Sequence, residues 1–368
     1  MKATILQSNF AKGLNQVSRV VASRTTLPVL GNILIVAKKG KITFSATDLE
    51  VGITTHVAGK VEEDGEITIP ARLLLDFISN NTDETIELVL VDTKIHLKSE
   101  HYEANISGIS AEEFPTIPNP PEDVFCSLKR SDFVDAIKKV AIAPANDETR
   151  PVLAGIYFHF NGKVLTMAAT DSYRLAEKKV NLESSIPEKK LIVPSRTMTE
   201  VLRLLSALEN IEEIALSSTE NQVFFQIGET HLVSRVIEGA FPNYSQIIPS
   251  GYKVLAKEDY REFLAALKMT SLFAKDAANN IKIKTTDQNL IISSAHAQSG
   301  DATSKVSAEV SGNDMEIAFN ARYLLDALQA VSSKAVTLKL NDSSSAAVLE
   351  FDQDKNYLYI IMPLKIEG

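Results

Sequence analysis

The sequence predicts an α+β fold in which a unit of about 120 residues, a common domain size, occurs three times along the chain. Three observations lead to this prediction. Residues recur at a fixed offset, proline-rich connectors separate the recurring units, and helix-like and strand-like patterns follow the same order in each unit. Since self-similarity at a fixed period indicates a repeated architecture, the chain is expected to hold three similar domains.

The recurrence is clearest between the first and second thirds of the chain. At an offset of 123 positions the triplet Ala46-Thr47-Asp48 recurs as Ala169-Thr170-Asp171. The third copy is fainter: Phe319 to Arg322 resembles Val193 to Arg196, and Asp259-Tyr260 is expected to correspond to Asp132-Phe133. Seven single residues also recur at the offset of 123, namely Ser8, Phe10, Val17, Thr26, Pro28, Val29 and Leu30, which meet Ser131, Phe133, Val140, Thr149, Pro151, Val152 and Leu153.

Two connectors set the expected domain boundaries. Asn119-Pro120-Pro121 closes the first unit, and Ile248-Pro249-Ser250-Gly251 closes the second. Proline fixes its own backbone and favours turns, so both segments suit links between domains. The predicted domains are therefore residues 1–121, 122–249 and 250–368.

Each unit is expected to contain two amphipathic helices with strands between them. Ser8 or Asn9 can cap the first helix, and Ser131 or Asp132 the corresponding helix of the second unit. The expected helices cover residues 8–24, 71–80, 131–143, 194–208, 258–275 and 320–334. Alternating segments at 41–45, 85–90, 222–226 and 281–284 predict strands. Helices mixed with mostly antiparallel strands indicate α+β, and the units are expected to pair through sheet edges that would otherwise be exposed.

Composition excludes several classes of protein. With 45% apolar and 23% charged residues, the chain is neither disordered nor fibrous. The longest apolar run, Tyr357 to Met362, is far too short to cross a membrane, and the first residues show no secretory signal. The single cysteine, Cys126, excludes an intramolecular disulfide and is expected to act as a small buried hydrophobe in a reducing cytoplasm.

No catalytic motif, metal site or cofactor site is found in the sequence. Phosphate-binding loops, nucleophile elbows and dinucleotide fingerprints are missing, and the six histidines are scattered without zinc-like spacing. Asp48 and Asp171 are the strongest candidates for an acid–base pair of an enzyme. However, both recur at the repeat offset directly after a strand, where aspartate commonly bonds to its own turn.

Charge is distributed unevenly between the predicted helices and the rest of the chain. The whole chain carries −9, whereas the six helix windows together carry +5 and the remaining 280 residues −14. Helices tolerate lysine and arginine well, which could explain the difference without any ligand. If the helices share one face, that face is mildly basic. Such a face would hold nucleic acid weakly, since affinity rises with the number of phosphates neutralised.

Several motifs, in order along the whole chain, resemble those of the bacterial sliding clamps, the beta subunits of DNA polymerase III. They are Thr26 to Asn32, Ala46 to Glu50, Ala169 to Ala176, Phe241 to Tyr244 and Ile360 to Lys365. The resemblance implies a head-to-tail homodimer whose six similar DNA-clamp domains close a ring around duplex DNA. Helices would line a central hole and antiparallel sheets would form the outer wall. The implied function is that of a non-enzymatic processivity factor that tethers the replicative polymerase.

The resemblance also implies a groove between the second and third domains for short motifs bearing Gln, Leu and Phe. The implied partners are the DNA polymerase III core, the clamp loader and other proteins with such motifs, and no membrane is implied. Carried over residue by residue, the groove comprises Leu153, Thr170, Ser172, Tyr173, Arg174, Leu175, Pro242, Gln246, Ile247, Ser344, Ala346, Ile360, Ile361, Met362, Pro363, Leu364 and Lys365. Tyr173, Gln246, Ser344 and Lys365 depart from the commonest family pattern and bear on peptide preference.

Two further sets of residues are assigned to DNA and to the dimer seam. Arg24 matches a family contact with DNA. The repeat itself suggests the other DNA-facing residues, Arg72, Arg150, Arg196 and Arg322. At the seam, Ala104 and Ile106 of one subunit are expected to face Leu272 and Phe273 of the other. A monomeric repeat scaffold that binds peptides without encircling DNA is the alternative that these residues leave open.

Overall fold

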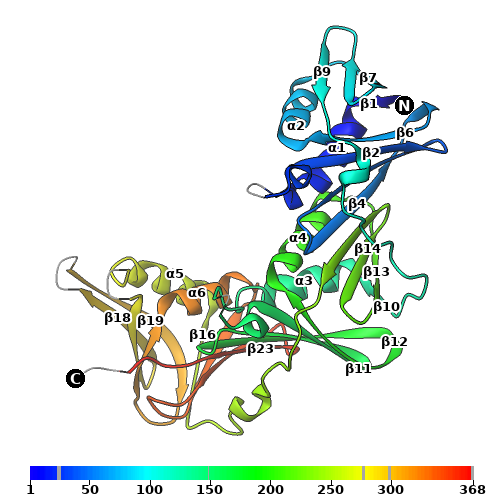
Figure 1. Ribbon diagram of the computed structural model, residues 1–368. Helices are drawn as coiled ribbons and strands as arrows, with labels where there is room; N and C mark the ends of the chain where they lie inside the picture. Colours follow the sequence, from blue (N-terminus) through cyan, green and yellow to red (C-terminus); the bar gives the residue numbers. More distant parts are fainter. Residues whose placement is uncertain (23–25, 148, 276–277, 297–299, 366–368) are drawn as a thin grey trace. The chain divides into compact units, whose positions relative to one another are not determined.

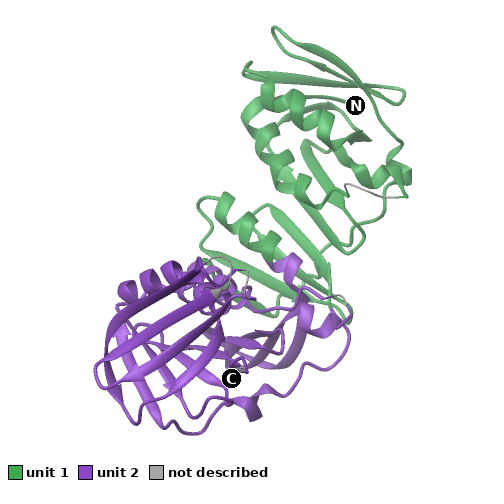
Figure 2. Cartoon of the chain, turned by 90° about the vertical axis from the view of Figure 1, so that its left-hand side faces the viewer, with its two compact units in different colours: residues 1–130, 199–236 green, residues 131–198, 237–368 purple. Residues whose placement is uncertain are grey.

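The computed structural model describes residues 1–22, 26–147, 149–275, 278–296 and 300–365, and these form two compact units. The first unit comprises residues 1–130 and 199–236, and the second comprises residues 131–198 and 237–368 (Figure 2). The predicted domains at 1–121, 122–249 and 250–368 remain a prediction, because sheets that run across the repeat boundaries group the chain differently.

The described residues of the first repeat form nine strands and two α-helices (Figure 1). The helices are α1 (Gln7–Val17) and α2 (Ala71–Asn80), and short 3-10 helices cover Ser18–Val20, Pro28–Gly31 and Ala111–Glu113. The strands are β1 (Lys2–Leu6), β2 (Asn32–Lys38), β3 (Lys41–Thr47), β4 (Val51–Val57), β5 (Lys60–Glu63), β6 (Gly65–Pro70), β7 (Thr85–Val91), β8 (Lys94–Lys98) and β9 (Glu103–Ser107).

The second and third repeats follow the same order of elements. Their α-helices are α3 (Arg130–Val140), α4 (Ser195–Ala207), α5 (Tyr260–Ser271) and α6 (Ala321–Gln329), with 3-10 helices at Pro151–Ala154 and Tyr244–Ile247. The second repeat has β10 (Cys126–Lys129), β11 (Gly155–Thr170), β12 (Arg174–Pro194), β13 (Glu213–Ser218), β14 (Gln222–Ile227) and β15 (Thr230–Arg235). The third has β16 (Val254–Asp259), β17 (Asn280–Thr286), β18 (Asn289–His296), β19 (Gly300–Ser311), β20 (Glu316–Asn320), β21 (Ala335–Leu340), β22 (Ala347–Phe351) and β23 (Tyr357–Ile361).

The repeats are joined through the edges of their sheets, as the sequence predicted. In the first unit β4 pairs with β15, which merges strands of two repeats into an eight-stranded sheet beside a five-stranded one. In the second unit β12 pairs with β23 inside a ten-stranded sheet. All of these pairings are antiparallel, and α5 and α6 pack beside each other in the second unit (Figure 1). The α+β prediction is confirmed.

The cores form where helices press aromatic residues onto these sheets. Phe10, Phe133 and Phe263 each stand at the fourth position of the first helix of a repeat and are fully buried. Phe10 stacks on Phe44 at 5.2 Å, and Phe133 meets Phe158 edge-on at 6.3 Å. The expected match of Asp259-Tyr260 with Asp132-Phe133 is therefore wrong: Phe263 corresponds to Phe133, and Tyr260 to Arg130.

The helix starts also differ from expectation at the first two repeats. The first helix begins at Gln7 directly after β1, and its N-cap, Leu6, offers no side-chain cap. Ser8 and Asn9, like Ser131 and Asp132 in α3, therefore lie inside the first turn instead of capping it. In α5 the cap is conventional: Asp259 Oδ1 accepts hydrogen bonds from the amides of Arg261 and Glu262.

The first residue of each repeat's first helix ties that helix to the second one. Gln7 Nε2 donates to the carbonyl of Ile78 at 2.8 Å, and Arg130 donates through Nε and Nη2 to the carbonyl of Leu205 at 2.9 and 2.6 Å. Tyr260 Oη donates to the carbonyls of Leu328 and Val331 at 2.7 and 2.9 Å. The last carbonyls of a helix have few donors within the helix. Three different side chains therefore supply a donor to the carbonyls near the end of the second helix.

We predict that Tyr260→Phe lowers the free energy of unfolding by about 1–2 kcal/mol, because it removes the hydroxyl that donates to the carbonyls of Leu328 and Val331 and leaves the former with the Val331 amide at 3.3 Å. Urea denaturation measures this. Tyr102→Phe, at a tyrosine that is 43% exposed, serves as the control and should change stability by less than about 0.5 kcal/mol. Equal effects of the two substitutions would contradict the assigned role of Tyr260.

Candidate functional site

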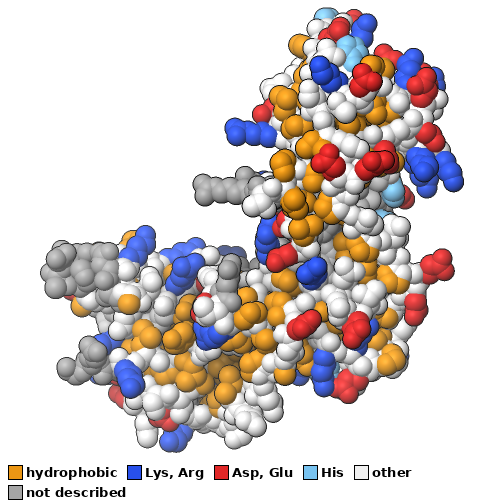
Figure 3. Space-filling view, viewed as in Figure 1, with side chains coloured by type: hydrophobic (Ala, Val, Ile, Leu, Met, Phe, Trp, Pro, Cys, Tyr) orange, Lys and Arg blue, Asp and Glu red, His pale blue; other side chains and the backbone are white. Residues whose placement is uncertain are grey.

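A cluster of apolar side chains lies in the second unit, where the second repeat meets the third and where the sequence predicts the peptide groove. Its floor is a cluster of four side chains at most 8% exposed, and half-buried apolar side chains pack around it. Apolar side chains are visible over this part of the unit in Figure 3. The floor residues are Leu175, Ala346, Val348 and Ile360, and the surrounding ones are Tyr244, Ile248, Tyr252, Leu358 and Met362.

The pairing of β12 with β23 decides which side chains reach the groove. Leu175 lies opposite Ile360, and Val348 of β22 lies on the other side of Ile360. Side chains alternate across a strand, so Leu175 and Ile360 share one face, whereas Arg174 and Ile361 share the other. Of the residues assigned to the groove, Ile361 is thus fully buried on the opposite face of the sheet.

A tight turn before β12 presents the exposed rim of the groove. Thr170 Oγ1 accepts from the amide of Ser172 and donates to the carbonyl of Arg174, while Asp171 Oδ1 accepts from the amides of Tyr173 and Arg174. Ser172 takes a left-handed backbone conformation with φ of 80°. As a result, the Tyr173 side chain is 57% exposed beside the groove.

The same turn occurs in the first repeat and explains both candidate acid–base carboxylates. Asp48 Oδ1 accepts from the amides of Glu50 and Val51 at 3.1 and 2.8 Å, as Asp171 does in the second repeat. Leu49 has φ of 77°, matching Ser172. The predicted turn role of Asp48 and Asp171 is confirmed.

Arg174 secures this end of β12. Its guanidinium lies 3.1 Å from Asp171 and 2.6 Å from Asp326, and 4.3 Å from the centre of the Tyr323 ring. Burial alone would lower the pKa of Arg174, but the neighbouring acidic groups outweigh it and raise the pKa. The residue is therefore a fixed cation that holds β12 to α6.

Aromatic residues after β15 build the opposite side of the groove. Tyr244 Oη donates to Glu177 at 2.6 Å, and Phe241 stacks on Tyr157 with ring centres 4.9 Å apart. Burial first, and then the Glu177 carboxylate, raise the pKa of Tyr244. Pro242 follows Phe241 directly and is exposed, so the stacked pair holds this rim in place.

The remaining residues assigned to the groove lie on the surrounding loops. Leu153 is buried at the end of a 3-10 helix, and Ser344 is held by hydrogen bonds to Asp342. The amide of Met362 donates to the carbonyl of Tyr173, and that of Leu364 to the carbonyl of Ala318. Gln246, Ile247 and Lys365 are exposed, and Pro363 and Leu364 are half-buried.

Sequence reasoning missed five members of this site. Tyr244 could have been found, because it ends the Phe241 to Tyr244 motif, and Leu358 alternates with Ile360 on the same strand. Ile248, Tyr252 and Val348 carry no such signal, since they reach the groove only through the path of the loops and the β22–β23 pairing.

The arginines assigned to DNA fall into three groups. Arg72, Arg196 and Arg322 each occupy the second position of α2, α4 or α6 and are exposed. Arg150 instead donates to Ser172 Oγ at 3.1 Å, which brings it to the rim of the groove. Arg24 lies outside the described residues.

The residues assigned to the dimer seam lie at two sheet margins. Ala104 and Ile106 belong to β9, the edge strand of the five-stranded sheet; Ala104 is half-buried and Ile106 is 4% exposed. Leu272 and Phe273 follow α5, and Leu272 is 56% exposed. Because the Ile106 side chain is buried, a partner strand could contact β9 at this residue only through the backbone.

Asp83, Glu100 and His101 form a group of metal-ligand side chains in the part of the chain that the structure describes. The Asp83 carboxylate accepts from the His101 amide at 2.8 Å and contacts its Nδ1 at 2.7 Å. Hydrogen bonds from Ser99 and His101 lower the pKa of Asp83 to about 2. The arrangement is a surface ion pair.

Cys126 is buried as expected, and burial raises the pKa of its thiol to about 12.

Three domain profiles of one protein family match the chain. They are the N-terminal, central and C-terminal domains of the DNA polymerase III beta subunit, at residues 1–118, 127–243 and 245–365. A beta sliding clamp from Synechococcus elongatus is 33% identical over 377 residues, covering all of both chains.

Solved structures agree with these matches. A DNA polymerase sliding clamp from Bacillus subtilis has a TM-score of 0.95 at 26% identity. A DNA polymerase III subunit beta from Pseudomonas aeruginosa, bound to griselimycin, has 0.94 at 29%. Both comparisons cover all of both chains. Among the described residues, no helix is both long and apolar enough to cross a membrane.

We predict that NMR titration gives His101 a pKa above 6.5, because the Asp83 carboxylate favours the protonated ring, and that Asp83→Asn lowers it. The ion pair therefore stabilises the fold below pH 6.5 and loses this effect as pH rises through the raised pKa of His101. His231 is the internal control: burial lowers its pKa, and this pKa should be the same in the unchanged protein and in Asp83→Asn. An unchanged pKa of His101 in Asp83→Asn would contradict the pair.

Proposed function

Because the chain belongs to the family of DNA polymerase III beta subunits, the sliding clamps, its role is that of a DNA polymerase processivity factor, and we propose that it fills this role as a closed homodimeric ring around duplex DNA. The observation that carries the proposal is the edge-to-edge pairing of the repeats. Each of the three repeats would be one domain, with boundaries at residues 1–121, 122–249 and 250–368.

The pairing pattern supports a head-to-tail dimer. At the two junctions within the chain, β4 pairs with β15 and β12 pairs with β23. The corresponding strand of the third repeat is β19, which pairs with β18 from Gly300 to Ser307 and with β16 from Ala308 to Ser311. At the other end of the chain, β9 corresponds to β15 and β23 and is an edge strand. Pairing β19 of one subunit with β9 of the next would join the third repeat to the first repeat of another subunit in the way that the two junctions within the chain are joined.

The exposed side chains after α5 fit the same interface. Leu272 is 56% exposed, and the Phe273 ring lies beside the start of β19, with Cε1 4.0 Å from the position that a Cβ on Gly300 would take. Leu272 and Phe273 would therefore cover the joint made with Ala104 and Ile106 of the partner strand. A heterologous contact of this kind either closes into a ring or grows into a fibre, and the family resemblance favours closure.

Retention on DNA would be topological, with weak electrostatic contacts. The chain carries −9, so bulk charge opposes tight binding to phosphates. Arg72, Arg196 and Arg322 nevertheless stand in the first turns of helices, where the helix dipole disfavours a cation. A repeated cation at an unfavourable position supports a role toward an external anion, here the DNA backbone. Arg24 and Arg150 are weaker members of this set.

We propose no catalysis for this protein. The two carboxylates that could have formed an acid–base pair accept hydrogen bonds from the backbone amides of the turns in which they lie.

Within the cytoplasm, the partners would be the DNA polymerase III core, the clamp loader and other proteins that carry short motifs with Gln, Leu and Phe. Such motifs would bind the groove of the second unit, where half-buried apolar rims surround a buried floor. The monomeric scaffold that binds peptides alone is the competing proposal.

We predict that the protein, once loaded by a bacterial clamp loader, stays on a nicked circular plasmid and leaves the same plasmid after it is linearised. The physical reason is that a closed ring can leave DNA only over a free end. Gel filtration of labelled protein with each DNA measures retention, and light scattering should first give twice the subunit mass of 40.3 kDa. Equal retention on both DNAs, or a mass of one subunit, would overturn the ring.

We predict that Tyr173→Ala combined with Ile247→Ala weakens binding of a peptide bearing Gln, Leu and Phe at least tenfold and reduces polymerase stimulation to the same extent. Both side chains are exposed at the rim, at 57% and 47%, so stability should change by less than about 1 kcal/mol. The matched control is Leu27→Ala with Leu49→Ala, two side chains each 48% exposed in the first repeat. Equal peptide affinity for both double variants would place the groove elsewhere.

A further inference from the structure

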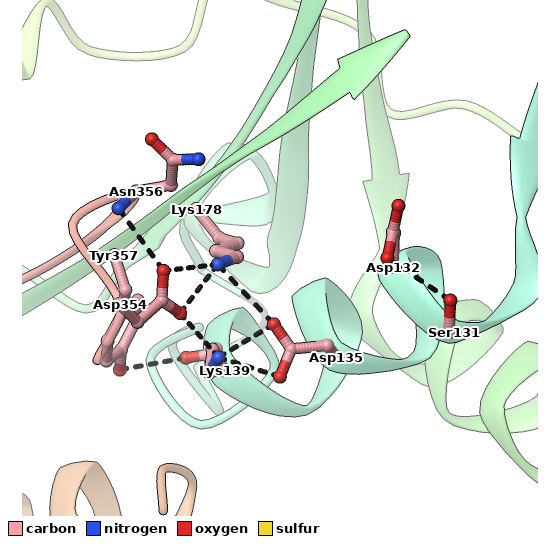
Figure 4. A network of polar contacts seen from close by, with 8 residues as sticks. All are labelled: Ser131, Asp132, Asp135, Lys139, Lys178, Asp354, Asn356 and Tyr357. Atoms are coloured by element: carbon pink, nitrogen blue, oxygen red, sulfur yellow. Dashed lines mark hydrogen bonds and ion pairs between the residues drawn. The ribbon is translucent and has the colours of Figure 1, made fainter. Parts of the chain in front are cut away.

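A buried ionic network lies directly behind the groove (Figure 4). The Asp354 carboxylate sits between Lys139 Nζ at 2.5 Å and Lys178 Nζ at 2.6 Å, and Asp135 completes the set at 2.7 Å from Lys139. The side chains of Lys139, Lys178 and Asp354 are only 8, 11 and 12% exposed. Two cations and two anions therefore balance: three of these side chains are largely shielded from water, and Asp135, at 45% exposed, stands at the solvent side.

The network connects three elements that are distant in the sequence. Lys139 belongs to α3, Lys178 to β12, and Asp354 to the turn between β22 and β23. The amide of Tyr357 donates to the carbonyl of Asp354, and Tyr357 Oη donates to the carbonyl of Lys139 at 3.2 Å. The start of β23 is thereby tied to α3 through both a side chain and the turn that precedes it.

Asp354 is the charge by which the turn before β23 is held, since it pairs with both lysines. Burial alone would raise the pKa of Asp354, yet hydrogen bonds from Lys139 and Lys178 lower it, so the carboxylate stays charged at neutral pH. Moving the turn would leave buried charges without partners, which costs far more than a shift of neutral groups. The network therefore favours one position of the turn and of the strand that follows it.

The first unit holds a neutral counterpart at the same place in the repeat. Gln16 and Thr55 lie 123 positions before Lys139 and Lys178, and Thr230 pairs with Thr55 as Tyr357 pairs with Lys178. Gln16 Oε1 accepts from Thr55 Oγ1 at 2.5 Å and from Thr230 Oγ1 at 3.0 Å. A polar link thus lies at both junctions. It is neutral at the β4–β15 junction and ionic at the β12–β23 junction, where β23 also contributes to the groove floor.

Strand geometry connects the network to the groove. Lys178 and Tyr357 lie at one end of the β12–β23 pairing, and Leu175 and Ile360 lie three residues further along their strands, on the opposite face. A displacement of the start of β23 would therefore shift Ile360 against Leu175 and Val348.

We propose that Lys139 and Lys178, acting through Asp354, are positioning residues of the peptide groove, an inference that rests on the proposed function. They touch no bound peptide; they hold β23 in the place at which Ile360, Leu358 and Met362 match an apolar peptide. Peptide affinity then depends on a network that faces away from the peptide.

The test compares peptide affinity among isosteric variants of the full-length protein. The probe is a fluorescent peptide bearing Gln, Leu and Phe, titrated by anisotropy at a temperature where thermal melts show every variant folded. Asp354→Asn should raise the Kd at least fivefold, because the two lysines then share Asp135 alone as their counter-charge, at 2.7 and 3.5 Å, and the turn before β23 loses its ionic tie. Thr230→Val, which removes a member of the neutral counterpart, should leave the Kd within twofold.

A second pair of variants separates positioning from folding. Lys139→Met removes the charge but retains the apolar stem and leaves the Asp354–Lys178 pair in place, whereas Lys139→Arg retains the charge. Affinity should fall at least threefold in Lys139→Met and return to within twofold of the unchanged protein in Lys139→Arg. That pattern supports positioning even if Asp354→Asn does not fold.

Two results would overturn the inference in distinguishable ways. If the unchanged protein binds the peptide and Asp354→Asn and Lys139→Met bind it equally well, the network has no part in the groove and the proposed function stands. If the unchanged protein itself fails to bind the peptide, the groove assignment is wrong and the positioning role falls with it.

Discussion

An open sheet edge carries unpaired backbone amides and carbonyls, and the arrangement of this protein depends on how such edges are satisfied. Within the chain, β15 completes the hydrogen bonding of β4 and β23 completes that of β12. These pairings make an eight-stranded and a ten-stranded sheet out of strands from different repeats. The groove exists because one pairing brings the last strand of the chain against the second repeat. The proposed ring extends the same pairing rule to a second subunit.

The two junctions share a backbone plan and differ in the side chains placed on it. In the first unit Gly52 faces Val233, and the Ile117 side chain lies where a side chain on Gly52 would begin, with Cγ2 only 3.0 Å from the position of an added Cβ. In the second unit Leu175 faces Ile360, and Tyr244 stands 127 positions after Ile117. A glycine covered by the chain's own isoleucine leaves little room for a peptide. In the second unit the leucine is instead covered by side chains of which several are half-buried, among them Tyr244, whose hydroxyl donates to Glu177.

Repeated positions also show that one structural task can be met by unlike chemistry. Gln7, Arg130 and Tyr260 all donate to carbonyls near the end of the neighbouring helix. Gln16 and Lys139 both link a first helix to the junction strands, one through neutral hydrogen bonds and the other through ions. Because the partner is a backbone carbonyl or a small polar cluster, any donor of suitable length serves, and sequence identity between repeats falls while geometry persists.

By itself the sequence determined the α+β class, the threefold repeat, the place of the six helices and the turn role of Asp48 and Asp171, because periodicity and turn chemistry are local properties. The helix expected over residues 8–24 was too long, since the α-helix ends at Val17 and a 3-10 helix follows at Ser18–Val20. The sequence also missed the helix starts at Gln7 and Arg130, where a strand runs straight into a helix, at Gln7 without a side-chain cap. Only the tertiary structure decided that Tyr260 corresponds to Arg130, that Arg174 and Ile361 face away from the groove, and that Tyr252 and Val348 face it. These assignments depend on strand register and loop paths, which long-range packing sets and no short pattern records.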